Sequence, residues 1–430
     1  MSSEWQPTSL GAICSAQGGA IQTGPFGSQL HTSDYKEIGV PVVMPTNIGD
    51  GGIAVEGIAR IGQEDVERLQ QHKLQLDDIV FSRRGDVTKN ALVRAHEAGW
   101  LCGTGCLKVR LGDQSIADAK FISYCLRLPD TKEWLIRHAV GGTMPNLNTG
   151  ILSAVPITLP PLSVQLEIAE ILGALDDRIT LLRETNATLE AIAQALFKSW
   201  FVDFDPVRAK AEGCQPEGMN APTAALFPDS FEESELGLVP KGWEIGQLQD
   251  LLVLQRGFDL PAAERTEGQY PLIAASGPSG THHIAMAKGP GVITGRSGVL
   301  GKVFLTLEDY WPLNTTLWVK EFKRATPCFA FQLLKLLDFG SFNAGSAVPT
   351  LNRNHIHSLK YVLPPVELVG AYEDAALVIH ERVLENNRQA QTLTQLRDTV
   401  LPRLISGQLR LPEAMAQISE STAQELQYAN

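Results

Sequence analysis

The strongest constraint on the fold comes from residues 159–204. This segment opens with a Pro-Pro pair and then contains no proline up to residue 204. Residues at the a and d positions of successive heptads are apolar with one polar exception, and they read Ile168, Leu172, Leu175, Ile179, Leu182, Asn186, Leu189, Ala193, Leu196 and Trp200. Such a seam is typical of a long helix that packs along a partner helix. At about 1.5 Å per residue, we expect a rod about 60 Å long.

The partner helix is supplied by an internal repeat. A shift of 204 positions places the Pro-Pro pair at residues 160–161 on the pair at 364–365, and the register also holds in the loop upstream. The sequence therefore predicts a duplicated half, with long helices at residues 159–204 and 364–410. The predicted helix-pairing residues are Ile168, Leu175, Leu182, Asn186, Leu189, Leu196, Trp200, Phe201, Ile379, Val383 and Leu393.

Polar and aromatic residues on these helices each have two interpretations. Asn186 and Asn386 either fix the register of the pairing or are ordinary exposed side chains. The aromatic residues Trp200, Phe201 and Phe204 end the first helix. They either pack in a core against the second helix or form a docking patch for a partner subunit.

The chain is acidic, with a formal net charge of −12, but the acidity is unevenly distributed. Residues 157–242 carry 14 acidic and 6 basic side chains, whereas residues 1–156 carry 16 and 14, and residues 243–363 carry 9 and 11. The negative charge therefore resides in the helical segments and the tail. This distribution removes the simplest objection to nucleic-acid binding, although it does not by itself create a basic patch.

Composition narrows the class of protein. With 44% hydrophobic and 20% charged residues the chain is globular. No apolar run approaches the roughly 18 residues of a membrane-spanning helix, and the N-terminus lacks the pattern of a signal peptide. The six cysteines contain no CxxC motif, so we expect reduced thiols and a cytoplasmic location.

The chain divides into alternating blocks. Residues 1–158 are predicted to form a mixed domain of short strands and helices, and residues 243–363 repeat it in outline. Residues 205–242 contain five prolines and little periodicity, so we expect a linker that runs over the surface outside any core. Residues 411–430 read as a polar tail.

This order of blocks resembles the specificity subunit of type I restriction-modification systems, over nearly all of residues 1–410. The phrases that carry the resemblance are TGPFGS at residues 23–28, VPVVMPTNI at 40–48, DDIVFSRRGDV at 77–87, LPPLSVQLEIAEIL at 159–172, LFKSWFVDFDP at 196–206 and VLPRLISGQL at 400–409. The Pro-Pro pairs with their helices and the segment LFKSWFVDF are the most specific of these features.

The resemblance implies an α+β fold of two mixed α/β target recognition domains separated by two long helices that pair as an antiparallel coiled coil. Each domain would read one half of a split double-stranded DNA target, and the helices would set the gap between the halves. Partners would be two methyltransferase subunits and, in the full complex, restriction subunits. This chain would be non-catalytic and bind no cofactor, since S-adenosylmethionine, ATP and Mg are expected on the partner subunits.

Candidate DNA contacts fall into three sets of polar loop residues. The first set follows a predicted strand in each half: Arg83, Arg84, Lys89 and Asn90, matched by Arg296, Ser297 and Lys302. The second set lies in the repeated loop before each long helix: Thr143, Asn146, Asn148, Ser346, Thr350, Asn352 and Arg353. The third set lies on the glycine-rich loop: Gln22, Thr23 and Ser28. Arginine and asparagine are the side chains that bind guanine and adenine edges, and small polar groups bind phosphate.

Each set also has a structural alternative. The first is explained equally by a solvated turn whose arginines form ion pairs with Asp77, Asp78 or Asp86. The second is explained by local capping and turn hydrogen bonds. The third is explained by a structural turn that needs glycine for its backbone.

Motifs for catalysis and metal binding are missing from the sequence. The stretch before Lys302 resembles a phosphate-binding loop, but Arg296 occupies the required glycine position and Val303 follows the lysine. The histidines at residues 282–283 and 355–357 lack carboxylate or thiolate partners at ligand spacing. A DNA-recognition subunit is therefore preferred to a stand-alone nucleic-acid-modifying enzyme or a coiled-coil protein-interaction adaptor.

Overall fold

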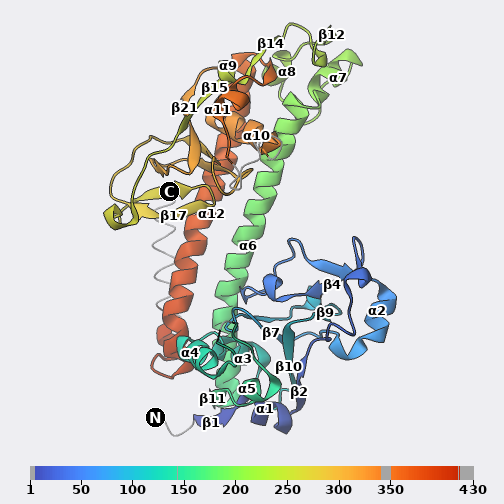
Figure 1. Cartoon of the computed structure of the whole chain (residues 1–430), viewed down its shortest axis with the longest axis vertical. Helices are drawn as coiled ribbons and strands as arrows, with labels where there is room; N and C mark the ends of the chain where they lie inside the picture. Colours follow the sequence, from blue (N-terminus) through green and yellow to red (C-terminus); the bar gives the residue numbers. More distant parts are fainter. Residues whose placement is uncertain (1–4, 143, 340–349, 415, 417–430) are drawn as a thin grey trace. The chain divides into compact units, whose positions relative to one another are not determined.

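The computed structural model describes residues 5–142, 144–339, 350–414 and 416 (Figure 1). The chain forms two compact units, unit 1 from Met1–Thr180 with Gln389–Asn430 and unit 2 from Leu181–Arg388. The two long helices, α6 (Leu162–Phe201) and α12 (Val366–Ile405), each contribute residues to both units. Each begins directly after its Pro-Pro pair, because proline fits the start of a helix but not its interior. The predicted α+β fold with two long helices in contact is confirmed.

Unit 1 contains a sheet-rich domain followed by short helices. Its strands are β1 (Gln6–Ser9), β2 (Gly18–Thr23), β3 (Tyr35–Lys36), β4 (Val40–Val43), β5 (Asp50–Gly51), β6 (Ala59–Ile61), β7 (Ile79–Ser82), β8 (Asn90–Leu92), β9 (Leu101–Cys102), β10 (Cys106–Gly112) and β11 (Pro156–Leu159). Its short helices are α1 (Leu10–Ala16), α2 (Gln63–Arg68), α3 (Ala119–Cys125), α4 (Pro129–His138) and α5 (Thr149–Ser153), with 3-10 turns at Thr32–Asp34, Pro45–Asn47, Gln70–His72 and Ala95–Glu97.

Unit 2 contains the corresponding elements and an additional segment before them. Its strands are β12 (Phe231–Ser234), β13 (Gly237–Pro240), β14 (Glu244–Gln247), β15 (Leu252–Arg256), β16 (Tyr270–Ala274), β17 (Gly277–His282), β18 (Gly291–Gly295), β19 (Val303–Thr306), β20 (Trp311–Pro312), β21 (Thr316–Phe322) and β22 (Lys360–Leu363). Its short helices are α7 (Asp205–Ala211), α8 (Ala221–Ala225), α9 (Leu248–Leu251), α10 (Pro327–Leu336) and α11 (Arg353–His357), with a 3-10 turn at Ala262–Glu264.

The sheet topology shows that the two units are copies of one design. In unit 1 the main sheet has the order β2-β10-β7-β8-β5, and in unit 2 it has the order β15-β21-β18-β19. The strand that opens each domain pairs antiparallel with the strand before the long helix, β1 with β11 and β14 with β22. In a second sheet of each unit a short parallel pair recurs, β4 with β9 in unit 1 and β16 with β20 in unit 2. The duplication seen in the sequence is therefore a duplication of topology.

In unit 1 the domain is anchored on both long helices. Ile168 and Leu172 of α6 and Val400 and Leu404 of α12 are buried in one apolar cluster with Phe121 of α3. Full burial of each such side chain contributes roughly 1.5–3 kcal/mol of transfer free energy. The loops of this domain therefore project from a core that is packed against both long helices.

Residues 205–242 differ from the sequence-based expectation. The segment was expected to run outside any core, yet Val207 and Phe227 are buried in the main cluster of unit 2. The reason is edge-to-face aromatic packing, since the Phe227 ring lies perpendicular to that of Trp200 with 5.4 Å between their centroids. Just before the segment, the Phe204 ring meets that of Trp243 in the same way, with 5.6 Å between the centroids. The elements are too short to produce a visible periodicity. Trp200 itself packs in this core, as one of its two interpretations proposed.

Within the described part of the chain, no helix combines the length and the apolar character that crossing a membrane requires.

Candidate nucleic-acid interface

In unit 1 the turn after β7 is joined to the loop before α5. The N–H of Leu147 donates to the carbonyl oxygen of Arg83 at 2.9 Å, and Arg84 and Asn146 form an isolated antiparallel bridge. The side chain of Arg83 adds to this link, because its Nε donates to Oδ1 of Asn146 at 3.3 Å. Gly85 completes the turn at a φ of 80°, which glycine adopts without strain. The first and second predicted sets therefore meet on one surface.

Unit 2 repeats this construction with different side chains. The N–H of Leu351 donates to the carbonyl oxygen of Arg296 at 2.9 Å, and Ser297 forms an isolated bridge with Thr350. Gly298, with a φ of 87°, occupies the place that Gly85 has in the first turn. The same backbone arrangement thus presents Arg-Arg in one unit and Arg-Ser in the other.

The glycine-rich loop adds a third segment to the surface of unit 1. It leaves β2 at Gly24, where a β-carbon would lie 2.1 Å from the carbonyl oxygen of Gly103, so only glycine fits. The guanidinium carbon of Arg83 lies 6.0 Å from the ring centroid of Phe26, which is cation–π distance. The loop is therefore a neighbour of the Arg83 turn.

Most of the predicted contacts are open to solvent. The exposed side chains are Gln22, Ser28, Arg84, Lys89, Asn148, Lys302, Asn352 and Arg353. The half-buried ones are Thr23, Arg83, Asn146, Arg296, Ser297 and Thr350. Thr143 and Ser346 lie outside the described residues.

The arginines of the first turn are not neutralised by the aspartates near them in the sequence. Asp78 pairs instead with Arg110, whose Nη2 lies 2.6 Å from its Oδ2. Asp86 accepts hydrogen bonds within its own turn, and these bonds lower the pKa of its carboxyl. Among the residues that the structure describes, no carboxylate lies within 4.0 Å of a nitrogen of Arg83 or Arg84. Two cations are therefore available for an anionic partner.

Three predicted asparagines have structural roles. Asn90 is fully buried, and its amide donates to backbone carbonyl groups. Asn90 is the first residue of β8, and its side chain points inward toward the end of α3. It therefore cannot contact DNA, and its prediction as a DNA contact is wrong. Asn148 and Asn352 cap α5 and α11, each accepting a hydrogen bond from a backbone N–H of its helix. The capping alternative thus applies to both, although both remain exposed.

The chain is similar to a family of known proteins. A family model described as the type I restriction modification DNA specificity domain matches residues 2–191. The type I restriction enzyme HindI specificity subunit of Haemophilus influenzae is 27% identical over 363 residues, covering 67% of this chain and 77% of the relative. The MjaIX specificity subunit of Methanocaldococcus jannaschii is 22% identical over 322 residues, covering 69% and 70%. This chain is therefore similar to the type I restriction-modification specificity subunits.

A solved structure agrees with this assignment at the level of the fold. The S subunit of the type I restriction-modification system from M. genitalium superimposes with a TM-score of 0.56 at 16% identity, covering 93% of this chain and 96% of that one. The paired loops of each unit present the polar and cationic side chains of the interface on this fold.

Some of the predicted helix-pairing residues form a polar layer in unit 2. Asn186 donates to Oδ1 of Asn387 at 2.9 Å and to the carbonyl oxygen of Val383 at 3.3 Å, and it accepts from Nδ2 of Asn386 at 2.8 Å. Asn186 and Asn386 are both buried. A layer of this kind favours one register of two helices over its neighbours.

A buried ionic cluster in unit 1 was missed by the sequence reasoning. The carboxylate of Asp176 on α6 accepts hydrogen bonds from Tyr124 of α3, from Arg127 and from Arg397 of α12. Burial alone would raise the pKa of the Asp176 carboxyl, but the two guanidinium groups and the tyrosine hydroxyl together hold it below its usual value. No local pattern marks these residues, since Asp176 lies beside the seam positions rather than on them.

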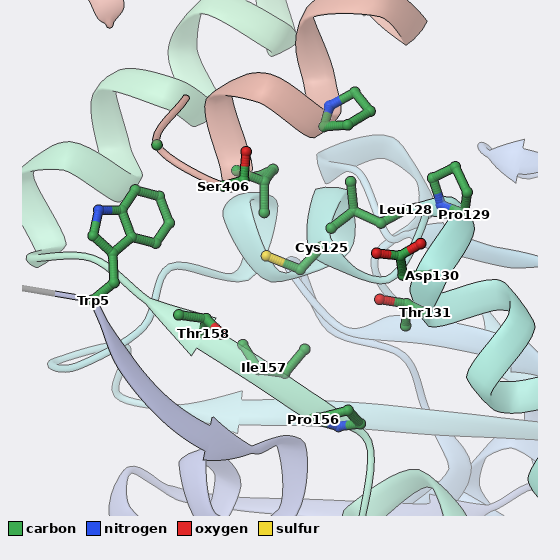
Figure 2. Close-up of a pocket in the computed structure, with 13 residues that line it drawn as sticks. Trp5, Cys125, Leu128, Pro129, Asp130, Thr131, Pro156, Ile157, Thr158 and Ser406 are labelled. Atoms are coloured by element: carbon green, nitrogen blue, oxygen red, sulfur yellow. The ribbon is translucent and has the colours of Figure 1, made fainter. Parts of the chain in front are cut away.

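The chain also has a cavity of about 680 Å³ in unit 1. Figure 2 draws the residues that line it, among them Trp5, Cys125, Asp130 and Ile157. None of the residues predicted to contact DNA lines it. Duplex DNA is read over an extended surface rather than in an enclosed cavity, so the loop surfaces are the better candidate.

Proposed function

We propose that this subunit reads a split double-stranded DNA target, with unit 1 contacting one half-site and unit 2 the other. The observation that carries the proposal is the repeated loop surface, in which one backbone design presents Arg83 and Arg84 in unit 1 but Arg296 and Ser297 in unit 2. Equal scaffolds with unequal side chains are what reading two different short sequences requires, because base-edge contacts specify sequence while the scaffold only positions them.

The long helices α6 and α12 would set the number of unread base pairs between the half-sites. One helical turn corresponds to roughly 5 Å, and one base pair to about 3.4 Å. The gap would therefore change by a base pair or two for each turn of helix that is added. The buried polar contacts of Asp176 and Asn186 support this role, since they favour a defined register in each unit.

The partners in this proposal are two methyltransferase subunits that methylate adenine, together with restriction subunits in the full complex. The subunit would be a cytoplasmic, non-catalytic component. S-adenosylmethionine, ATP and Mg would be bound by the partner chains. This division of labour is supported by the names of the matched relatives, which are all specificity subunits.

The test is methylome sequencing of the host with and without an in-frame deletion of the gene. Loss of one split adenine motif on deletion is the expected result, and it names the target and the gap together. An unchanged methylome, followed by failure of the purified complex with methyltransferase subunits to bind DNA sequence-selectively, would overturn the proposal. Turnover of S-adenosylmethionine by the isolated chain would identify a stand-alone enzyme instead.

Two point variants then assign the half-sites. Arg84→Ala is expected to relax one half of the motif, and Arg296→Ala the other, because each unit reads its own half. Arg137→Ala and Lys360→Ala are matched controls, since both remove an exposed, ion-paired cation outside the loop surfaces. Variants that affect both halves equally would contradict the assignment of one unit to each half.

A further inference from the structure

Phe26 is an exposed aromatic side chain on the otherwise polar loop surface of unit 1. Its side chain is 55% exposed, whereas the preceding Gly24 and Pro25 are buried. Its backbone is fixed in a turn, since its N–H donates to Oε1 of Gln29 at 3.1 Å and its carbonyl oxygen accepts from the N–H of Leu30 at 3.2 Å. A fixed backbone with an uncovered ring does not serve the packing of the core.

Further apolar side chains lie on the adjoining loop. Asn146, which binds the side chain of Arg83, also pairs with Val140 through a backbone bridge. Val140 is 62% exposed and Met144, within the same loop, is 61% exposed. Single exposed apolar residues are normal on protein surfaces. Here, however, several occur on loops that are hydrogen-bonded to the turn of Arg83 and Arg84, two arginines without a carboxylate partner among the described residues.

The fold does not require an exposed ring at this place, as unit 2 shows. The loops after β2 and β15 both leave the sheet at a glycine pressed against a carbonyl oxygen, Gly24 in unit 1 and Gly257 in unit 2. The next aromatic residue in unit 2, Phe258, packs against Trp311 and Trp318 at centroid distances of 6.5 and 6.0 Å. The counterpart of Phe26 is thus half-buried against two tryptophans.

We propose that Phe26, supported by Met144 on the adjoining loop, inserts as an apolar wedge at a base step of the half-site that unit 1 contacts. Phenylalanine and methionine are among the side chains that proteins insert between base pairs, and insertion partly unstacks the step and kinks the duplex. The occupant is double-stranded DNA because Arg83 borders the ring, and neither Arg83 nor the adjacent Arg84 has a carboxylate partner among the described residues. This inference rests on the proposed function of unit 1.

The wedge gives the subunit a second task beyond recognition. An enzyme that modifies a base within a duplex must first extrude it from the stack, at a cost in unstacking and unpairing. A base step already opened by Phe26 would lower that cost for a methyltransferase subunit bound to the same DNA. Recognition of the half-site and preparation of the base would then occur in one binding step.

The experiment uses the full complex with methyltransferase subunits and a duplex that carries the motif found by methylome sequencing. One strand has 2-aminopurine in the half-site affected by Arg84→Ala, and the duplex ends carry a dye pair that reports bending. Phe26→Ala is expected to lower the rate of methylation about tenfold, to remove the fluorescence increase and to reduce the bend. Phe26→Leu, which keeps an apolar wedge, is expected to retain most of all three signals.

Val55→Ala is the matched control, because Val55 is 59% exposed in the same unit and lies outside the three loops. It should behave as the unaltered protein. Phe26→Ala is expected to keep the melting temperature unchanged, and Met144→Ala provides a second test if it does not. The predicted effect of Met144→Ala is a smaller loss of bending.

The results for these variants distinguish failure of the Phe26 wedge from failure of DNA reading by unit 1. Full bending and fluorescence in folded Phe26→Ala, with binding lost in Arg84→Ala, would overturn the wedge and leave DNA reading by unit 1 intact. Weaker binding of Phe26→Ala with unchanged bending would also overturn it, since Phe26 would then be a surface contact only. If neither variant changes DNA binding, the assignment of the half-site to unit 1 fails with it.

Discussion

Asp176 of α6 and Arg397 of α12 form an ion pair, with 2.7 Å between Oδ1 of the carboxylate and Nη1 of the guanidinium, although 221 residues separate them in the sequence. Their side chains are only 19% and 12% exposed. The residue numbers of this pair and those of the pair Asn186 and Asn387 have the same sum, 573. Within each unit, the contact therefore joins α6 to α12 in an antiparallel arrangement.

Replacing Arg397 by alanine should destabilise unit 1 because the buried carboxylate of Asp176 loses one of its two cations. We expect the free energy of unfolding to fall by about 2–4 kcal/mol, somewhat less than for complete loss of a buried pair because Arg127 remains. Chemical denaturation measures the change. Arg137→Ala, which breaks an exposed pair with Glu133, should cost less than about 1 kcal/mol. Equal losses for the two variants would contradict a buried, strong pair.

The amide layer in unit 2 predicts that two substitutions destabilise the protein less than one. Asn186→Ala leaves the buried Asn386 without its acceptor, which should cost about 1–3 kcal/mol of unfolding free energy. Replacing both Asn186 and Asn386 by leucine should cost less, because no buried amide is then left unpaired. Denaturation of the three proteins tests this order, and a double variant less stable than the single one would refute it.

The stability of unit 2 should depend on pH through His380. Burial, followed by the charge of Lys335, lowers the pKa of this histidine from 6.5 to about 4. Between these values the unfolded chain binds a proton that folded His380 does not, so stability is full above pH 6.5 and is lost as pH falls toward 4. From pH 7 to pH 5 the free energy of unfolding should drop by about 2 kcal/mol.

The measurement is chemical denaturation at both pH values, compared with His380→Gln, in which this dependence should be missing. Phe331, whose ring centroid lies 5.5 Å from that of His380, covers the histidine and provides a second variant. Phe331→Leu should weaken the pH dependence, because partial exposure moves the pKa back toward 6.5. A pH dependence that is identical in all three proteins would show that other groups cause it.

Arg84 should contribute a salt-sensitive contact to DNA binding. Its side chain is exposed, and no carboxylate neutralises it within the described residues. If it binds phosphate, Arg84→Ala should reduce the slope of log K against log salt by about 1. If it binds a base edge, the slope should persist while the preference for one half-site falls. Titrations at several salt concentrations separate these results, and no change in either would remove Arg84 from the interface.

Lengthening the helix near Asn186 tests whether α6 sets the gap. An insertion of four residues adds about 6 Å of helix, which corresponds to one or two base pairs. We expect methylome sequencing to show a longer gap with unchanged half-sites. An unchanged gap would count against the helices as the ruler, whereas loss of all methylation would call for the same insertion in α12 to restore the pairing.

The loop surfaces were predictable in part from sequence, since Arg83 and Asn146 were both selected from their positions after a strand and before a helix. Their contact was not predicted, because it joins positions 63 residues apart. The burial of Asn90 was also missed, because a short strand does not reveal which face its first residue takes. Phe26 was passed over as an ordinary loop residue, and only its exposed fraction distinguishes it.

The sequence by itself determined the duplication, the two long helices and the loops that precede them, because these are encoded by local spacing: heptads, paired prolines and glycines at turns. The tertiary structure alone decided which charges pair and which remain open. Asp78 pairs with Arg110, so that no carboxylate of the described residues pairs with Arg83, whereas Asp176 of α6 pairs with Arg397 of α12. Ion pairing and burial depend on distances between segments far apart in the chain, and no local pattern carries that information.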